Sequence, residues 1–199
     1  DTVQETVRIK NRLTTIKRRA RLFGQKDKLD HAPFIQEQYD LQLKLLNASC
    51  DEYQQKIQSS VKNFKESRYL MSIPGIAFIQ SAKIISQVVD PNRFSNKYKF
   101  FAYCGLVKHP RISANRKYGS TRIWGNRTLK CVFKMAAHSA LNGHNSLKVL
   151  YESLRQRGLC DADARNAIAR KIATLSLTLW KNKQFFNERI ILESLPAKT

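Results

Sequence analysis

The chain has 199 residues, with 36 Lys and Arg against 15 Asp and Glu, which gives it a formal charge of +21. Hydrophobic residues make up 42% of the sequence, so a disordered tail is excluded and a real core can form. No apolar run approaches the roughly 18 to 20 residues of a membrane span, and we expect neither a span nor a secretory signal. A charge of this sign indicates an anionic partner, most often nucleic acid and less often an anionic membrane surface.

The cysteines favour reduced thiols over a metal site. The sequence has four of them, and no two are arranged as C-x-x-C, so we expect no zinc site. Nothing else in this lysine-rich chain is typical of a secreted protein, which argues against disulfides. The four positions are Cys50, Cys104, Cys131 and Cys160.

Two stretches at heptad spacing predict a long, basic helical hairpin in residues 1–67. They cover residues 2–23 and 39–64, and the polar segment 24–33 between them contains the Gly and Pro of a turn. An antiparallel, coiled-coil-like pair is the simplest arrangement, and the same seam also fits a second copy of the chain, so we expect a homo-oligomer. The seam residues are Ile9, Leu13 and Ile16, followed by Tyr39, Leu43, Leu46, Cys50, Tyr53 and Ile57.

The rest of the sequence predicts a compact helical domain in residues 68–185 and a C-terminal tail in residues 186–199. Its short apolar blocks are separated by Gly and Pro, and few stretches alternate like a β-strand. We therefore expect a mainly α protein, with a loop rich in Ser, Asn, Gly and Arg at residues 107–125. Helices are predicted at residues 79–89, 97–103, 126–141, 146–157 and 161–180.

The stretch between Asp90 and Glu152 contains no acidic residue but twelve basic ones. A solvated surface usually mixes both signs, because repulsion between like charges destabilises a fold. Incidental basicity is the simplest alternative, but the pattern favours a surface that binds phosphates and releases their counterions. We expect nucleic-acid contacts from Lys108, Arg111, Arg116, Lys117, Arg122, Arg127, Lys130 and Lys134.

The segment Ile73-Pro74-Gly75-Ile76-Ala77, between two predicted helices, has the form of a helix-hairpin-helix turn. In such a turn a glycine lets backbone amides approach a phosphate, near the N-terminus of the second helix. We therefore add Gly75 and Ile76 to the expected nucleic-acid contacts. The usual second glycine of the motif is Ala77 here, and an ordinary tight turn is the alternative.

Four short blocks follow one another along the second part of the chain. They are LMSIPGI at residues 70–76, FAYCGLV at 101–107, GNRTLK at 125–130 and ARNAIARK at 164–171. Together they resemble the C-terminal half of the insertion-sequence transposases of the IS110 group, which move DNA with a bridge RNA as guide. The predicted helical hairpin is similar to the segment that links the two halves of those enzymes. The resemblance implies DNA and a structured guide RNA as partners, and a cytoplasmic location at the bacterial nucleoid.

The resemblance also implies a serine nucleophile and a separate metal-binding half. In those enzymes a serine in the loop after the Gly-Leu block becomes covalently joined to DNA, and Ser113 stands at that position here. Ser120 is the second candidate, because Ala114 replaces the usual glycine and the loop varies within the family. The family's four acidic residues lie in an N-terminal RuvC-like domain without a counterpart in this sequence. The chain begins at Asp1 instead of Met, so we expect a truncated or partial transposase.

The residue types around Ser113 agree with this division. A serine hydroxyl attacks a phosphodiester only when a base or metal draws off its proton, and the phosphoserine link then conserves the bond energy. Arg111, Arg116 and Lys117 are close enough in sequence to neutralise the phosphate. The acid-free stretch offers no carboxylate ligand, so we expect no cofactor in this chain and Mg²⁺ only with the RuvC-like domain. A Ser–His pair with His109 is disfavoured, since no nearby carboxylate orients the ring.

The sequence thus predicts a partial serine-type transposase that is inactive as this chain alone. The alternative is a non-catalytic helical protein that coats DNA or structured RNA with its basic surface. A helical protein at a membrane surface is a third alternative. The salt dependence of binding tests for a polyanionic partner, and covalent trapping separates the first two interpretations.

Overall fold

The computed structural model describes residues 2–23, 32–122 and 125–193, and the chain divides into two units. The first unit is Asp1–Ile57 and the second is Gln58–Thr199. The division falls inside the long second helix, before the change of composition near Arg68 on which the sequence-based boundary rested.

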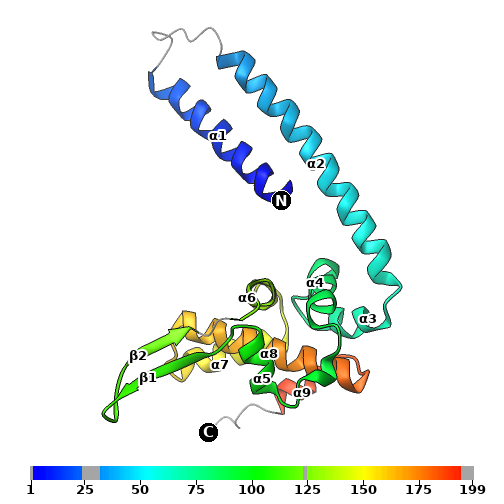
Figure 1. The fold of residues 1–199 in the computed structure, drawn as a ribbon, viewed down its shortest axis with the longest axis vertical. Coiled ribbons are helices and arrows are strands. Elements are labelled where there is room, and N and C mark those ends of the chain that lie inside the picture. The colour runs from blue at the N-terminus through cyan, green and yellow to red at the C-terminus, as the bar shows by residue number, and fades with distance from the viewer. Residues whose placement is uncertain (1, 24–31, 123–124, 194–199) are drawn as a thin grey trace. The chain divides into compact units, whose positions relative to one another are not determined.

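The first unit contains α1 (Thr2–Phe23) and most of α2 (Ala32–Lys62), two helices that run antiparallel to each other, as Figure 1 shows. Thr6, Ile9 and Leu13 of α1 are buried, and their spacing of three and four residues places them on one face of the helix. Burying an Ile or Leu side chain contributes roughly 1.5–3 kcal/mol. This stripe therefore holds α1 against α2 and confirms the helical pair that the heptad spacing predicted.

The second unit is a helical core organised around α8 (Asp161–Asn182), along which Ile168, Ile172 and Leu179 are buried. The core also takes Leu129 and Phe133 from α6. A mainly α fold is confirmed. The helices that pack against α8 are α3 (Lys65–Met71), α5 (Lys97–Tyr103), α6 (Arg127–Leu141) and α7 (Ser146–Gln156), while α4 (Phe78–Val88) packs on α3 and α6.

Asparagine side chains fix where three of these helices begin. Asn96 accepts hydrogen bonds from Tyr98 N and Lys99 N at the start of α5. Asn126 caps α6 in the same way, and Asn145 caps α7. Each cap satisfies amides that have no partner within the helix, which typically contributes about 1 kcal/mol.

The prediction of a loop at residues 107–125 is wrong over most of that range. β1 (Lys108–Ser113) and β2 (Arg116–Arg122) form an antiparallel hairpin that extends from the helical core (Figure 1). Ala114 and Asn115 at its tip have φ values of 47° and 60°, as a two-residue type I′ turn requires. The sequence did not reveal the strands because basic and polar residues dominate both of them, so no apolar residues recur at every second position.

The stretch assigned from sequence to a C-terminal tail contains one further short helix, α9 (Arg189–Leu192). Ile191 of α9 is fully buried in the second unit, and α9 packs against α7. The described part of this stretch, residues 186–193, is therefore part of the packed unit. Residues 194–199 lie outside the described part of the chain.

Among the described helices, none combines the length and the apolar character that crossing a bilayer demands.

Candidate nucleic-acid interface

The tip of the β1–β2 hairpin carries the serine that the sequence analysis singled out. Ser113 is the last residue of β1, its side chain is exposed, and its partner across the turn is Arg116, which is also exposed. Two large side chains near the tip are solvent-exposed as well, Ile112 at 63% and Tyr118 at 69%. The hairpin thus presents a hydroxyl, a guanidinium and an aromatic ring to solvent.

For several of the predicted contact residues in the hairpin, the structure describes the pairing of the backbone but not the side chain. The strand register pairs Lys108 with Arg122 and Arg111 with Gly119, with an irregularity between Arg111 and Ile112. The side chains of Lys108, Arg111 and Arg122 lie outside the part of the chain that the structure describes. The same holds for the side chains of His109, Lys117 and the second nucleophile candidate, Ser120.

The base of the hairpin is closed by two glycines. A Cβ atom on Gly125 would lie 2.5 Å from Gly105 N and 2.7 Å from Ala102 O, so only a glycine fits there. Next to this contact, Asn126 N donates to Tyr103 O at 2.7 Å. The segment that carries the hairpin therefore leaves and re-enters the helical core at one point.

A side-chain network supports this base from α4. The Tyr103 hydroxyl donates to Gln87 O at 2.9 Å, and Asn126 Nδ2 donates to Gln87 Oε1 at 2.6 Å. The guanidinium of Arg93 lies 4.6 Å from the centre of the Tyr103 ring, within the range of a cation–π contact. Tyr103 is thus held by hydrogen bonding and packing, which fixes the polypeptide just before Gly105.

A cleft of about 310 Å³, here called the basal cleft, opens beside the base of the hairpin. Two helices line it with charged side chains, and the aliphatic stem of Lys130 packs 3.6 Å from the point that a Cβ atom on Gly105 would occupy. The structure therefore brings two predicted contacts, Lys130 and Lys134, to the same place as the hairpin base. The residues that define the cleft are Gly105, Leu106 and Val107, with Lys130 and Lys134 of α6 and Asp163, Asn166 and Arg170 of α8.

The α8 side of the basal cleft was missed by the sequence analysis. Asp163, Asn166 and Arg170 follow one another at spacings of three and four residues, which places them on one face of α8. That polar stripe beside the apolar face was visible in the sequence and is the pattern that would have identified them. Arg127, by contrast, is exposed at the start of α6 and is not among the cleft residues.

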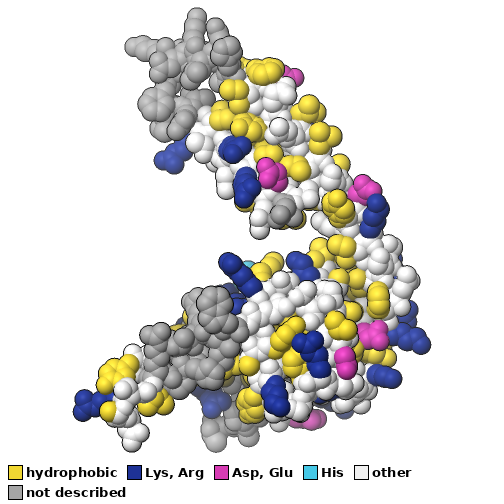
Figure 2. Space-filling model, viewed as in Figure 1, with side chains coloured by type: hydrophobic (Ala, Val, Ile, Leu, Met, Phe, Trp, Pro, Cys, Tyr) yellow, Lys and Arg dark blue, Asp and Glu magenta, His cyan; other side chains and the backbone are white. Residues whose placement is uncertain are grey.

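The second unit has a positive surface on which acidic side chains are sparse. Figure 2 shows Lys and Arg side chains spread over the face in view, with few Asp and Glu among them. Near α5, burial and then the positive charge of Lys97 lower the pKa of Lys171. A neighbouring cation depresses a lysine pKa because it destabilises the charged form, which is the effect expected of a positive region.

The predicted helix-hairpin-helix turn is used for packing. A Cβ atom on Gly75, where φ is +90°, would lie 2.1 Å from Ala136 O, so the glycine lets this turn touch the backbone of α6. The Ile76 side chain is buried, its amide donates to Ile73 O, and the Ala77 amide donates to Gln80 Oε1. With these two amides engaged inside the chain, phosphate binding by Gly75 and Ile76 stays an untested prediction.

An exposed polar network, which the sequence analysis did not identify, joins α6, α7 and α8. The Tyr151 hydroxyl donates to the Asp161 carboxylate, and Arg165 Nε donates to the same carboxylate at 2.9 Å. Arg165 Nη1 also lies 3.1 Å from His138 Nδ1. The hydrogen bonds from Tyr151 and Arg165 lower the pKa of Asp161, whereas the bond to Asp161 raises the pKa of Tyr151. The network links α6, α7 and α8 through side chains at the surface of the second unit.

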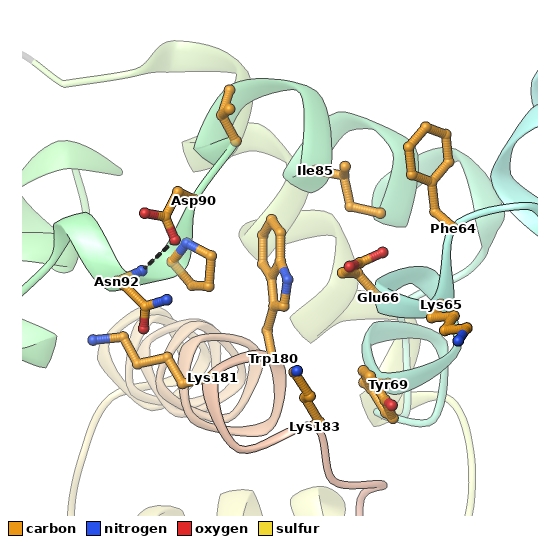
Figure 3. Close-up of a pocket in the computed structure, with 12 residues that line it drawn as sticks. Phe64, Lys65, Glu66, Tyr69, Ile85, Asp90, Asn92, Trp180, Lys181 and Lys183 are labelled. Carbon is orange, nitrogen blue, oxygen red and sulfur yellow. Dashed lines mark hydrogen bonds between the residues drawn. The ribbon is translucent and has the colours of Figure 1, made fainter.

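A cavity of about 690 Å³ lies at the other end of α8, where Trp180 stands between Ile85 and the residues after α4 (Figure 3). Two of its polar side chains are engaged within the chain. Lys181 Nζ donates to Phe94 O at 2.6 Å, and the Asp90 carboxylate accepts a hydrogen bond from Asn92 N. The size of the cavity suits a small ligand.

The described residues contain no cluster of three or more His, Cys, Asp or Glu that would hold a metal ion. Between Asp90 and Glu152, the stretch that contains Ser113, the sequence has no carboxylate of the kind that Mg²⁺ prefers as a ligand. Hydroxyl, amide and cationic groups predominate in the interface, and Asp163 adds one carboxylate at the basal cleft.

Comparison with known proteins finds a match to a transposase family. Residues 67–152 match the family described as Transposase IS116/IS110/IS902, which confirms the resemblance seen in the sequence blocks. The chain is also similar to an insertion element IS116 uncharacterized 44.8 kDa protein of Streptomyces clavuligerus, with 22% identity over 147 residues. That alignment covers 73% of this chain but only 37% of the relative. The matched region includes the whole β1–β2 hairpin and both lysines of the basal cleft.

Proposed function

We propose that this chain is the DNA-contacting, nucleophile-bearing part of a transposase, and that the β1–β2 hairpin presents Ser113 to a phosphodiester. One observation carries the proposal: Ser113 is exposed at a hairpin tip, opposite Arg116, within a stretch without carboxylates. A two-stranded antiparallel ribbon has the dimensions to enter a DNA groove. In this proposal the hairpin is an arm that brings the Ser113 hydroxyl to the sugar-phosphate backbone of the DNA.

The reaction proposed for Ser113 is a transesterification. Its Oγ forms a bond to phosphorus, the bond from phosphorus to one sugar oxygen breaks, and that oxygen leaves as a hydroxyl after taking up a proton. The Ser113 proton passes to a general base, and no energy source is consumed because one phosphodiester replaces another. The exposed guanidinium of Arg116 is placed to stabilise the charge that develops on the phosphoryl oxygens.

The general base and any Mg²⁺ must come from outside the acid-free stretch. We propose that an acidic RuvC-like domain provides them, either in a longer chain or in trans. The isolated 199 residues should then bind DNA but should not cleave it when magnesium is added. Cleavage by the isolated chain would contradict this division between two domains.

Covalent trapping tests the nucleophile. With the acidic domain supplied, denatured and nuclease-trimmed protein should carry a phosphoserine at position 113, mapped by mass spectrometry. Ser113→Ala should abolish the adduct and leave binding nearly unchanged, because a neutral hydroxyl adds little to a polyelectrolyte interaction. Ser120→Ala is the matched control in the same hairpin and should keep the adduct. An adduct that is lost in Ser120→Ala and kept in Ser113→Ala would make Ser120 the nucleophile.

Binding without any adduct would favour the second candidate function, a non-catalytic protein that coats nucleic acid. The basic surface supports both functions equally, so the trapping result decides between them. The logarithm of the binding constant for duplex DNA should fall with the logarithm of salt concentration by about 0.9 per phosphate contacted. Competition with a structured RNA in the same assay tests the proposed guide-RNA partner. A slope near zero would exclude both polyanion-binding functions.

We also propose that the first unit joins two copies of the chain. Two residues of the predicted seam on α2, Tyr53 at 58% and Ile57 at 37%, are exposed. Leu41 and Leu45 expose 52% and 64% of their surface on the same helix. Exposed apolar residues at helical spacing are typical of an association surface. Sedimentation of the purified chain measures the oligomeric state directly.

A further inference from the structure

The basal cleft combines groups from two helices that are far apart in sequence. Lys130 and Lys134 come from consecutive turns of α6, and Asn166 and Arg170 come from consecutive turns of α8. The two helices pack directly against each other, so these side chains converge on one volume of about 310 Å³. A concave site built on packed helices is held more firmly than charges scattered over a loop.

The chemistry of the cleft suits a single phosphate. Three cations and one carboxylate, Asp163, line it, so the site is positive, and Asn166 adds a neutral amide donor. Arg170 offers a planar fork of donors that matches phosphate oxygens, while the lysines act as point charges. Asp163 accepts a hydrogen bond from Cys160 Sγ at 3.3 Å, which directs part of its acceptor capacity toward the N-terminus of α8.

We propose that the basal cleft seats one backbone phosphate of the nucleic acid on which the hairpin acts. This rests on the proposed function, because it takes the hairpin as the arm that reaches the scissile bond. The cleft lies beside Gly105, where the chain leaves the core towards β1. A phosphate held there fixes the nucleic acid at the root of the arm, while Ser113 acts at its tip.

The geometry of β1 sets the distance between the two points. From Val107, which also lines the cleft, to Ser113 the chain advances six residues along β1. At roughly 3.3 Å per residue this is about 20 Å. DNA rises about 3.4 Å per base step. A duplex that runs beside the arm therefore has about six base pairs, measured along its axis, between the phosphate in the cleft and the phosphate attacked by Ser113.

The first test uses salt dependence on a mixed-sequence duplex DNA. Lys134→Gln combined with Arg170→Gln should reduce the slope by about 0.9, the value for one phosphate, because both side chains serve the same phosphate. Two independent contacts would reduce it by about 1.8 and would overturn the proposal, as would no change. Lys83→Gln removes a charge from an exposed position on α4 and should leave the slope unaltered.

An isosteric pair gives a second test that does not depend on truncating side chains. Asn166→Asp places a second carboxylate in the cleft, and Asn182→Asp adds the same charge at the exposed far end of the same helix. Binding should weaken markedly only for Asn166→Asp, with circular dichroism spectra matching the wild type. Equal weakening by both variants would mean that overall charge, and not the cleft, controls affinity.

The outcomes separate this proposal from the proposed function. A salt slope near zero for the wild type would contradict both nucleic-acid binding and the phosphate site. A steep slope for the wild type that is unchanged in the double variant would contradict only the proposal that the basal cleft binds a phosphate. In the trapping assay, replacing single phosphates by neutral methylphosphonates should interfere with binding about six steps from the nucleotide joined to Ser113. Interference confined to the neighbours of that nucleotide would contradict the proposed spacing.

Discussion

The backbone of Gly125 runs so close to that of Gly105 that a side chain on Gly125 would begin 2.5 Å from the Gly105 nitrogen. This contact joins the two ends of the segment that contains the β1–β2 hairpin. It places the start of α6 beside the end of α5, where Asn126 N reaches Tyr103 O. The position of the hairpin, and therefore of Ser113, depends on two backbones meeting without side chains between them.

Gly125→Ala should destabilise the second unit by about 1–3 kcal/mol, because the added methyl group meets backbone atoms that cannot rotate away. Chemical denaturation measures the effect. Gly143→Ala is the matched control, since its Cβ would lie 3.3 Å from the side-chain amide nitrogen of Asn145 and 3.8 Å from Ala140 O, with no closer atom. The control should change the free energy of unfolding much less. Equal losses at both positions would show that the Gly105–Gly125 contact has no special role.

Two leucine substitutions distinguish the inside of the helical hairpin from its outside. Leu13 is 5% exposed on α1, so Leu13→Asp buries a carboxylate and should separate α1 from α2, at a cost of several kcal/mol, on the order of the desolvation penalty for a buried charge. Leu45 is 64% exposed, so Leu45→Asp should keep the helical content. Circular dichroism measures the first effect.

Sedimentation of the same two variants tests the oligomer. If α2 joins two copies through its exposed apolar side chains, Leu45→Asp should lower the sedimentation coefficient without loss of helix. Unchanged sedimentation from an oligomeric wild type would place the interface elsewhere. Retained helicity in Leu13→Asp would mean that the α1 stripe contributes little to the pair.

The helices could be predicted from the sequence because local chemistry specifies them. The heptad spacing of Ile9 and Leu13 and the caps at Asn96, Asn126 and Asn145 each act within a turn or two of the chain. The β1–β2 hairpin had no such local signature. Its strands show no alternation of apolar and polar residues, and its turn uses Ala114 and Asn115 instead of the glycine that usually marks positive φ.

The candidate site was predictable only in part, for a related reason. Ser113 was found by its place in a family pattern, and Lys130 and Lys134 by their sign in an acid-free stretch. Arg170 belongs to the same cleft but lies 36 positions beyond Lys134, in a helix that also contains acidic residues. Arg170 lies near the two lysines only because α6 packs on α8, and a local stretch of sequence does not show which helices pack together.

The cysteines should differ sharply in reactivity. Cys104 is fully buried, and burial raises the pKa of its thiol far above the usual range, so little of the reactive thiolate forms. Cys131 and Cys160 are exposed. Alkylation with iodoacetamide, followed by mass spectrometry, should modify these two first and reach Cys104 only after denaturant is added. Native Cys104 that reacts as fast as Cys131 would contradict its placement in the core.

The Asp161 carboxylate should make the second unit sensitive to acid. Hydrogen bonds from Tyr151 and then Arg165 lower its pKa in the folded state below the ordinary value of 3.8. A carboxyl group with a depressed pKa stabilises the fold above its unfolded pKa, and this contribution is lost as pH falls through the folded value. Asp161→Asn should therefore lower the melting temperature slightly at pH 7, and the difference from wild type should vanish at low pH.

Asp163→Asn is the control for this effect. Both residues lie in the first turn of α8, so either substitution removes the same favourable interaction with the helix dipole. Only Asp161 also holds Tyr151 of α7 and Arg165. Melting curves between neutral pH and pH values below 3.8 should thus show a larger, pH-dependent loss for Asp161→Asn. Identical curves for the two variants would reduce the role of Asp161 to the helix dipole, and a loss that persists after full protonation would show that the hydrogen bonds do not depend on its charge.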